Sequence, residues 1–204
     1  MDLSKISKIT DNIYLSGIFP LDENYELVKQ LNIKYIVCCV DRSYISEIHD
    51  RVMVDNPDII IVYLPYNDEI SQNLWKKNID DVDIIKYVTS SEEYNLLRDQ
   101  LKHYHNKPMI EIAYHFINNL PVSDKNILVH CMAGISRSVS MVAYYLMKKY
   151  HMTYNDALKY IKNKRKIANP NDSFKMQLQK YQKKRELFDE KDANIIIHSI
   201  KKNK

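Results

Sequence analysis

The sequence predicts an α/β fold in which a central, mainly parallel sheet is flanked by helices. Three short apolar runs rich in β-branched residues are typical of buried strands, and helical patterns lie between and after them. Strands that alternate with helices favour parallel pairing within one sheet. The length of 204 residues suits a single domain, residues 1–204, with room for an insertion.

The first half of the chain supplies most of the predicted strands. The apolar runs are residues 33–40, 59–65 and 127–130. An earlier stretch, residues 12–16, predicts a strand at the edge of the sheet. Between these strands, residues 22–31 predict one short helix.

Helices dominate the second half of the predicted fold. Pro108 fits the first turn of a helix whose apolar face carries Ile112, Phe116 and Leu120. Residues 138–149 are apolar nearly all round, which indicates a buried central helix.

Two more helices are expected near the C-terminus. Thr153 and Asp156 form a capping-box-like start for a helix that runs through residue 164. The apolar stripe of the last helix consists of Phe174, Leu178 and Tyr181.

One polar region, at about residues 69–107, interrupts the alternation of strands and helices. It contains Trp75, the only tryptophan, and ends in a capped helical pattern that starts with Ser90 and Ser91. No strand is predicted within it. We expect a partly helical insertion that packs on the domain. It either covers the cleft, docks substrate or forms a homodimer contact, or it packs on the side of the domain without a role in chemistry.

The composition excludes several classes of protein. Hydrophobic residues make up 45% and charged residues 27%, as in soluble globular proteins, so a largely disordered chain is not expected. A net charge of +4 suits an anionic substrate but is too small to predict stable nucleic-acid binding. The sequence has neither a signal-peptide pattern nor an apolar run of about 18 residues, the length of a membrane span.

The cysteine content predicts the cellular compartment, and the amino-acid composition predicts the kind of genome from which the chain comes. The three cysteines cannot form a disulfide framework, and the adjacent Cys38 and Cys39 lie in an apolar run typical of a core. We therefore expect a reducing, intracellular and cytoplasmic location. Abundant Lys, Ile, Asn and Tyr indicate a low-GC genome, such as that of a parasite or a large DNA virus. For a virus, the location would be the host cell or the virion.

The most informative stretch runs from the strand at residues 127–130 into the helix that begins near Ser138. Five residues separate Cys131 from Arg137. A short loop that enters a helix N-terminus can turn its backbone N–H groups inward and bind an anion. Gly134 lets a ligand approach closely, and Arg137 offers a planar fork for two phosphate oxygens. This positive surrounding favours the thiolate form of Cys131, a nucleophile for phosphoryl transfer.

An isolated cysteine followed six residues later by an arginine is common and carries little weight alone. Here one of only two glycines in the chain lies inside the loop, where roughly fourteen would be expected overall. His130 precedes the cysteine, and the hydroxyls of Ser136 and Ser138 flank Arg137. Together these features favour a functional loop over an incidental pairing.

These residues resemble the signature loop of cysteine-dependent protein tyrosine phosphatases, and residues 133–138 resemble the dual-specificity subgroup in particular. The resemblance extends to residues 9–17, which include the second glycine, and to the helical segments 143–147 and 156–158. It also includes the closing segment at residues 167–178. It therefore covers nearly the whole chain except the insertion, and it implies the fold of that family.

The resemblance implies a role for each residue of the loop. Cys131 would be the nucleophile that forms a cysteinyl-phosphate, and Ser138 would hydrogen-bond its sulfur and ease its departure. His130 would orient the loop and would not act as a base. The phosphoryl oxygens would be held by the Arg137 side chain and by loop N–H groups: those of Met132, Ala133, Gly134, Ile135, Ser136 and Arg137.

The mechanism also needs an acid for the leaving oxygen, which then serves as a base for water. The family carries an Asp after a strand like residues 61–65, and Asp68 occupies that place here. Its separation from Cys131 is longer than is usual in the family, which the insertion explains if it begins directly after Asp68. Asp99 lies nearer the usual spacing but in a helical pattern, and Glu69 is a weaker alternative still.

The resemblance implies a protein phosphatase that acts on phosphotyrosine, phosphoserine and phosphothreonine in phosphorylated proteins. The chain lacks a recognisable phosphotyrosine-recognition segment of the tyrosine-specific relatives. Two alternatives are an RNA 5′-phosphatase, for which the charge is only weakly basic, and a phosphate-binding pseudophosphatase. Neither a metal nor another cofactor is expected, because the histidines do not cluster with cysteines in the sequence.

Overall fold

The computed structural model describes residues 3–77, 79–86, 91–119 and 125–202. Within them, six strands form one sheet in the order β1-β2-β6-β3-β4-β5. The four inner strands are parallel: β2 (Ile13–Ser16), β6 (Asn126–His130), β3 (Ile33–Cys38) and β4 (Ile60–Tyr63). The short β1 (Ser7–Lys8) and β5 (Asp83–Ile85) pair antiparallel at the two edges. The predicted α/β class with a mainly parallel sheet is confirmed.

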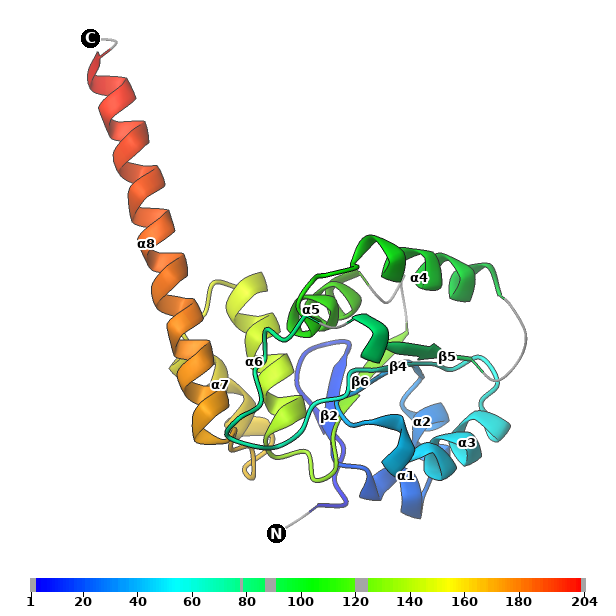
Figure 1. Cartoon of the computed structure of the whole chain (residues 1–204). Helices are drawn as coiled ribbons and strands as arrows, with labels where there is room; N and C mark the ends of the chain where they lie inside the picture. The colour runs from blue at the N-terminus through cyan, green and yellow to red at the C-terminus, as the bar shows by residue number, and fades with distance from the viewer. Residues whose placement is uncertain (1–2, 78, 87–90, 120–124, 203–204) are drawn as a thin grey trace.

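Helices lie on both sides of the sheet (Figure 1). One group consists of α1 (Phe19–Glu23), α2 (Glu26–Gln30) and α3 (Ser46–Asp55), with the 3₁₀ turn η1 (Arg42–Tyr44). The other group consists of α5 (Met109–Asn119), α6 (Arg137–Lys149), α7 (Tyr154–Lys164) and α8 (Asp172–Lys202). The insertion adds the 3₁₀ turn η2 (Ile79–Asp81) and α4 (Glu92–His103).

Helix α6 is the central helix of the second group, as the apolar run predicted. Every residue from Ser138 to Met147 is buried. Helix α7 begins at the predicted cap, where Thr153 Oγ1 accepts a hydrogen bond of 3.1 Å from the backbone N–H of Asp156. Helix α5 buries Ile112 and Phe116 as expected, whereas Leu120 lies outside the described residues.

Several local predictions are wrong. Residues 12–16 are not an edge strand, because β1 pairs with the outer side of β2. The single helix expected at residues 22–31 is two short helices, and the Asn24 side chain accepts a hydrogen bond of 3.2 Å from the Glu26 N–H where the second begins. Helix α3 was not predicted. Helix α8 continues far beyond the predicted stripe and leaves the body of the domain (Figure 1).

The insertion also contains a strand that the sequence did not predict. β5 extends the sheet along β4, although only Ile84 of its three residues is buried. Helix α4 begins at Ser91, whose Oγ accepts a hydrogen bond of 3.2 Å from the Tyr94 N–H, while Ser90 lies outside the described residues. The insertion is therefore partly helical, and it is also continuous with the sheet.

Helix α4 packs against the beginning of β3, at the end remote from Cys131. Glu93 forms an ion pair of 2.5 Å with Lys34 and accepts a hydrogen bond from the Tyr35 hydroxyl. The opposite end of β3 is the one in register with the end of β6, where Cys38 lies beside His130. This placement favours the interpretation that α4 itself packs on the domain without covering a site at Cys131.

The parallel strands direct their carboxyl ends to one edge of the sheet. Gly17 follows β2, Cys131 follows β6 and Asp68 lies five residues beyond the end of β4. In open α/β sheets, ligands bind outside this edge. Among the described residues, no helix is both long and apolar enough to cross a membrane.

If the insertion is part of the folded domain, a core residue of α4 must contribute to stability. Leu97 is 2% exposed, whereas the adjacent Leu96 is 59% exposed. We expect Leu97→Ala to lower the free energy of unfolding by about 2 kcal/mol or more, because it removes buried methyl groups and leaves a cavity. Urea denaturation measures this change. Leu96→Ala is the matched control, with an expected change within about 0.5 kcal/mol, and equal effects of both substitutions would contradict the packing.

Candidate active site

The loop after β6 surrounds the sulfur of Cys131. The Gly134 N–H donates a hydrogen bond of 3.3 Å to Sγ, and the Ser138 hydroxyl donates another of 3.2 Å. Cys131 is 1% exposed, and the loop leads directly into α6, whose first residue is Arg137. The helix N-terminus therefore adds its positive end to the donors around the sulfur.

Both glycines of the chain lie where this loop contacts the end of β2. Gly134 has φ +67°, and a Cβ there would lie 2.3 Å from the carbonyl carbon of Ser16. A Cβ on Gly17 would lie 2.7 Å from the Met132 carbonyl oxygen. Neither position has space for a side chain, which explains why a chain so poor in glycine retains one at each.

Arg165 binds the loop from behind and was missed by the sequence analysis. Its Nε donates to the Gly134 carbonyl at 2.7 Å, and its Nη2 donates to the Ala133 carbonyl at 3.1 Å. The side chain is buried, and Nη1 also donates to the Lys5 carbonyl at 2.7 Å. Because these carbonyls are held on the outer side of the loop, the loop N–H groups are free to face its centre.

The Arg137 guanidinium lies at the mouth of the loop. Nη1 donates a hydrogen bond of 3.1 Å to the Tyr66 carbonyl, which fixes the side chain. Nε is buried and has no hydrogen-bond acceptor among the described residues; its distance to Asp68 Oδ2 is 3.8 Å. A buried donor without an acceptor is costly, and a phosphoryl oxygen would supply one.

Asp68 reaches the same loop from the end of β4. Its Oδ1 accepts hydrogen bonds from the Ser136 hydroxyl at 2.6 Å and from Asn171 Nδ2 at 2.8 Å. The Asn171 N–H in turn donates to Ser136 Oγ at 3.1 Å. The side chain of Asp68 is 36% exposed, so a substrate oxygen can approach it from solvent. Asn171, also missed as a site residue, comes from the closing segment just before α8.

The rival carboxylates lie elsewhere. Asp99 is on the exposed surface of α4, where a hydrogen bond of 2.9 Å from Lys102 and the charge of that lysine lower the pKa of the carboxyl group. Glu69 is exposed and accepts a hydrogen bond of 3.3 Å from Ser71. Of the three candidates, Asp68 is the one that the structure brings to Arg137 and Ser136.

The start of the insertion holds the segment after Asp68 against α8. Gln177 Nε2 donates to the Gln72 carbonyl at 2.9 Å, and its Oε1 accepts from the Leu74 N–H at 2.8 Å. Gln72 Oε1 accepts from the Asn67 N–H at 3.0 Å, next to Asp68. Trp75 then stacks on Tyr181 of α8, with ring centroids 5.9 Å apart. This part of the insertion, unlike α4, supports the site directly.

His130, the predicted orienting residue, is fully buried behind the loop. Its Nδ1 lies 3.3 Å from the Cys131 carbonyl oxygen, and burial lowers the pKa of its imidazole to about 4. A neutral ring suits a structural role better than that of a base at neutral pH. Burial raises the pKa of the Cys38 and Cys39 thiols, so these two thiols are poor nucleophiles.

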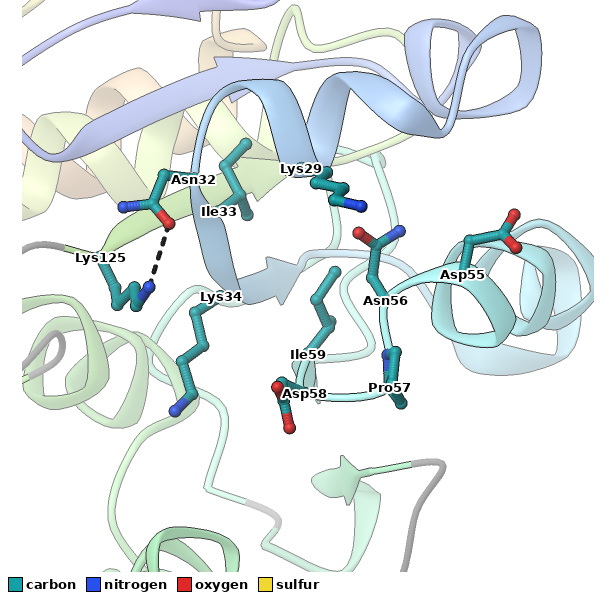
Figure 2. A pocket seen from close by; sticks show the side chains of 10 residues that line it. All are labelled: Lys29, Asn32, Ile33, Lys34, Asp55, Asn56, Pro57, Asp58, Ile59 and Lys125. Atoms are coloured by element: carbon teal, nitrogen blue, oxygen red, sulfur yellow. Dashed lines mark hydrogen bonds between the residues drawn. The ribbon is translucent and has the colours of Figure 1, made fainter.

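A hollow of about 360 Å³ lies at the opposite edge of the sheet, where β3 and β4 begin (Figure 2). Its lining mixes positive and negative side chains: Lys29, Lys34 and Lys125 with Asp55 and Asp58. Lys125 Nζ already donates a hydrogen bond of 3.2 Å to Asn32 Oδ1, and Lys34 forms an ion pair with Glu93. The described residues that line this hollow include no cysteine, serine or histidine, and carboxylates accompany its lysines, so the loop after β6 is the better candidate site.

Comparisons with known proteins show the family to which this fold and loop belong. A family model described as the catalytic domain of dual specificity phosphatases matches residues 21–184, which include both Asp68 and the loop. A protein of Acanthamoeba polyphaga mimivirus named as a tyrosine-protein phosphatase is 56% identical over 200 residues, covering 98% of this chain and 94% of that protein.

More distant relatives share part of their length or the fold alone. Slingshot homolog 1, a protein phosphatase of Mus musculus, is 30% identical over 196 residues, which cover 88% of this chain but 18% of that protein. The crystal structure of a human tyrosine phosphatase-like serine/threonine/tyrosine-interacting protein superposes with a TM-score of 0.60 at 20% identity. That match covers 87% of this chain and 95% of the human one.

Proposed function

The chain belongs to the dual specificity phosphatase family, and on that premise we propose that it dephosphorylates proteins through a phosphocysteine at Cys131. It is a protein phosphatase of the dual-specificity class, and its substrates are phosphorylated proteins. The RNA 5′-phosphatase and pseudophosphatase alternatives are not favoured. The single observation that carries the assignment of residues is the convergence of Cys131, Arg137 and Asp68 on one loop.

The first chemical step transfers the phosphoryl group to the enzyme. The Cys131 thiolate attacks phosphorus, an S–P bond forms, and the bond from phosphorus to the substrate oxygen breaks. Asp68 gives its proton to the leaving oxygen, so that the product departs as a neutral alcohol or phenol. The hydrogen bonds that Asp68 accepts from Ser136 and Asn171 hold the carboxyl group at the rim of the loop.

The second step releases phosphate. Asp68, now a carboxylate, takes a proton from water while the water oxygen attacks phosphorus and the S–P bond breaks. The Ser138 hydroxyl, 3.2 Å from Sγ, stabilises the thiolate that leaves. No metal or organic cofactor enters this scheme, because the cysteine, the aspartate and water account for every bond that is made or broken.

The negative charge of the phosphoryl group is stabilised by the loop and by Arg137. We assign its three oxygens to Arg137 and to the N–H groups from Met132 to Arg137. The unpaired Nε of Arg137 and the carbonyls held back by Arg165 support this assignment. Donors that are fixed before the substrate arrives need no reorganisation when charge develops.

We infer from the same site which phosphorylated residues the enzyme accepts and in which kind of compartment it works. We propose that it accepts phosphotyrosine, phosphothreonine and phosphoserine, that it binds no nucleic acid stably, and that any homodimer uses the insertion. The three cysteines are free, and a catalytic thiolate works only while reduced. We therefore place the enzyme in a reducing cellular compartment, that of the host if the chain is viral.

Substitution of the nucleophile and of the arginine tests the assignment. We expect Cys131→Ser to lower kcat on a phosphotyrosine peptide by about a thousandfold or more while phosphate-ester binding persists, because the loop survives without its thiolate. Arg137→Lys should lower kcat/KM about a hundredfold, since an ammonium cannot reproduce the bidentate geometry. Turnover by Cys131→Ser within tenfold of wild type would contradict the role of Cys131.

A matched pair of substitutions tests the acid. We expect Asp68→Asn to lower kcat/KM, which reports the phosphoryl-transfer step, about a hundredfold on phosphoserine and phosphotyrosine peptides, and much less on an aryl phosphate whose leaving group needs no proton. Asp99→Asn, on exposed α4, should leave all three rates unchanged. Steady-state kinetics across this substrate panel measure the difference, and the reverse pattern would transfer the acid to Asp99.

A further inference from the structure

A second buried histidine lies behind the active-site loop. His49, on α3, is fully buried although the sequence around it is polar. Its Nε2 lies 3.0 Å from His130 Nε2, and its Nδ1 lies 2.6 Å from the Tyr63 hydroxyl at the end of β4. The two imidazole rings stand almost perpendicular, at 86°. One continuous row of hydrogen bonds therefore runs from β4 through α3 to the residue before Cys131.

The Cys131 carbonyl oxygen, at the end of this row, determines which group donates in each hydrogen bond. A backbone carbonyl can only accept, so His130 Nδ1 carries the proton that faces the Cys131 carbonyl, 3.3 Å away. In a neutral ring the other nitrogen, Nε2, must then accept, and His49 Nε2 is the donor. His49 Nδ1 is left as an acceptor, and the Tyr63 hydroxyl donates to it.

Burial keeps His130, His49 and Tyr63 uncharged, as these hydrogen-bond directions require. It lowers the pKa of His130 to about 4 and the pKa of His49 well below its usual value. The charges of Arg42 and Arg137 act in the same direction, on His49 and His130 respectively. Burial also raises the pKa of Tyr63, so its hydroxyl stays protonated. At neutral pH each tautomer is therefore fixed by its neighbour.

We propose that His49 is a positioning residue for the phosphatase reaction: by donating to His130 Nε2 it fixes the ring that holds the Cys131 carbonyl and thereby the place of the sulfur. The inference rests on the proposed function of Cys131. Without the His49 donor, His130 would be free to adopt the other tautomer and to turn away from the loop. The hydroxyl of Tyr63 sets the tautomer of His49 in turn.

The same groups do not favour a metal ion. Cys38, His49 and His130 offer ligand atoms that lie within 4.8 Å of one another. However, the two histidine Nε2 atoms are hydrogen-bonded to each other, and the Cys38 thiol donates a hydrogen bond of 3.5 Å to the Val40 carbonyl. A ligand must be deprotonated to bind a metal, and burial raises the pKa of this thiol.

Two substitutions at His49 separate positioning from mere packing. His49→Leu fills the space but removes both the donor and the acceptor. His49→Gln restores one donor and one acceptor on a single amide, spaced much like the two ring nitrogens. We expect kcat on an aryl phosphate to fall about tenfold in His49→Leu, with KM changed much less, and to recover to within about threefold of wild type in His49→Gln.

The reactivity of Cys131 gives a readout that does not depend on phosphatase turnover. Alkylation by iodoacetate, followed at the Cys131 peptide over a range of pH, reports how readily the thiolate forms. The midpoint of this profile should move to higher pH in His49→Leu and return in His49→Gln. His115→Gln, at a half-buried position of α5 where the ring stacks on Tyr104, is the control and should leave kcat and the profile unchanged.

The kinetics and alkylation of the folded variants decide whether His49 positions the loop or only packs behind it. A folded His49→Leu with wild-type kcat and a wild-type alkylation profile would overturn the proposal, as would equal losses in the Leu and Gln variants. If His49→Leu does not fold, Tyr63→Phe tests the same row from its other end and should lower kcat by about twofold or more. An unchanged Tyr63→Phe enzyme would then overturn the proposal. A wild-type protein without phosphatase activity, but with alkylation that responds to His49, would reject the proposed function and leave the role of His49 intact.

Discussion

Backbone N–H groups can converge on a phosphoryl group only if the carbonyls of the same residues are bound on the other side. In this protein Arg165 binds the Gly134 and Ala133 carbonyls, and the end of β2 lies so close that Gly17 and Gly134 have no space for a side chain. Desolvated carbonyls without partners would cost free energy, so this buried arginine is a condition for the shape of the loop. The nucleophile, the helix N-terminus and Arg137 depend on that shape.

The remaining parts of the site reach the loop from different sides of the fold. Asp68 arrives from β4 and is held by Ser136 and by Asn171 in the segment before α8, while Gln177 of α8 fixes the chain after Asp68. His130 contacts the Cys131 carbonyl of the loop, and His49 contacts His130 in turn. Because Asp68 precedes the long insertion while its partners Ser136 and Asn171 follow it, the insertion can lengthen the chain without separating the acid from Cys131.

The features that could be predicted from the sequence are those that depend on residues adjacent to one another in the chain. The strand before Cys131 and the helix after it have strong apolar patterns, and the loop between them carries its chemistry within a few positions. β5 was missed because three residues are too few to show alternation, and α3 because its pattern is mostly polar. Arg165, Asn171 and His49 were missed because their roles come from contacts with residues far away in the sequence. Arg165 lies between two lysines and looks like a surface residue until the fold buries it.

The proposed reaction transfers the phosphoryl group to Cys131, where the loop binds its oxygens until water releases it as phosphate. A rapid-quench experiment with Asp68→Asn tests this directly, because the variant lacks the base that activates water and should accumulate the intermediate on an aryl phosphate. Mass spectrometry of the acid-quenched, digested protein should find one phosphoryl group on the Cys131 peptide, and none when Cys131 is replaced by Ser. A phosphoryl group on another residue, or turnover of the aryl phosphate without any labelled Cys131 peptide, would contradict the account.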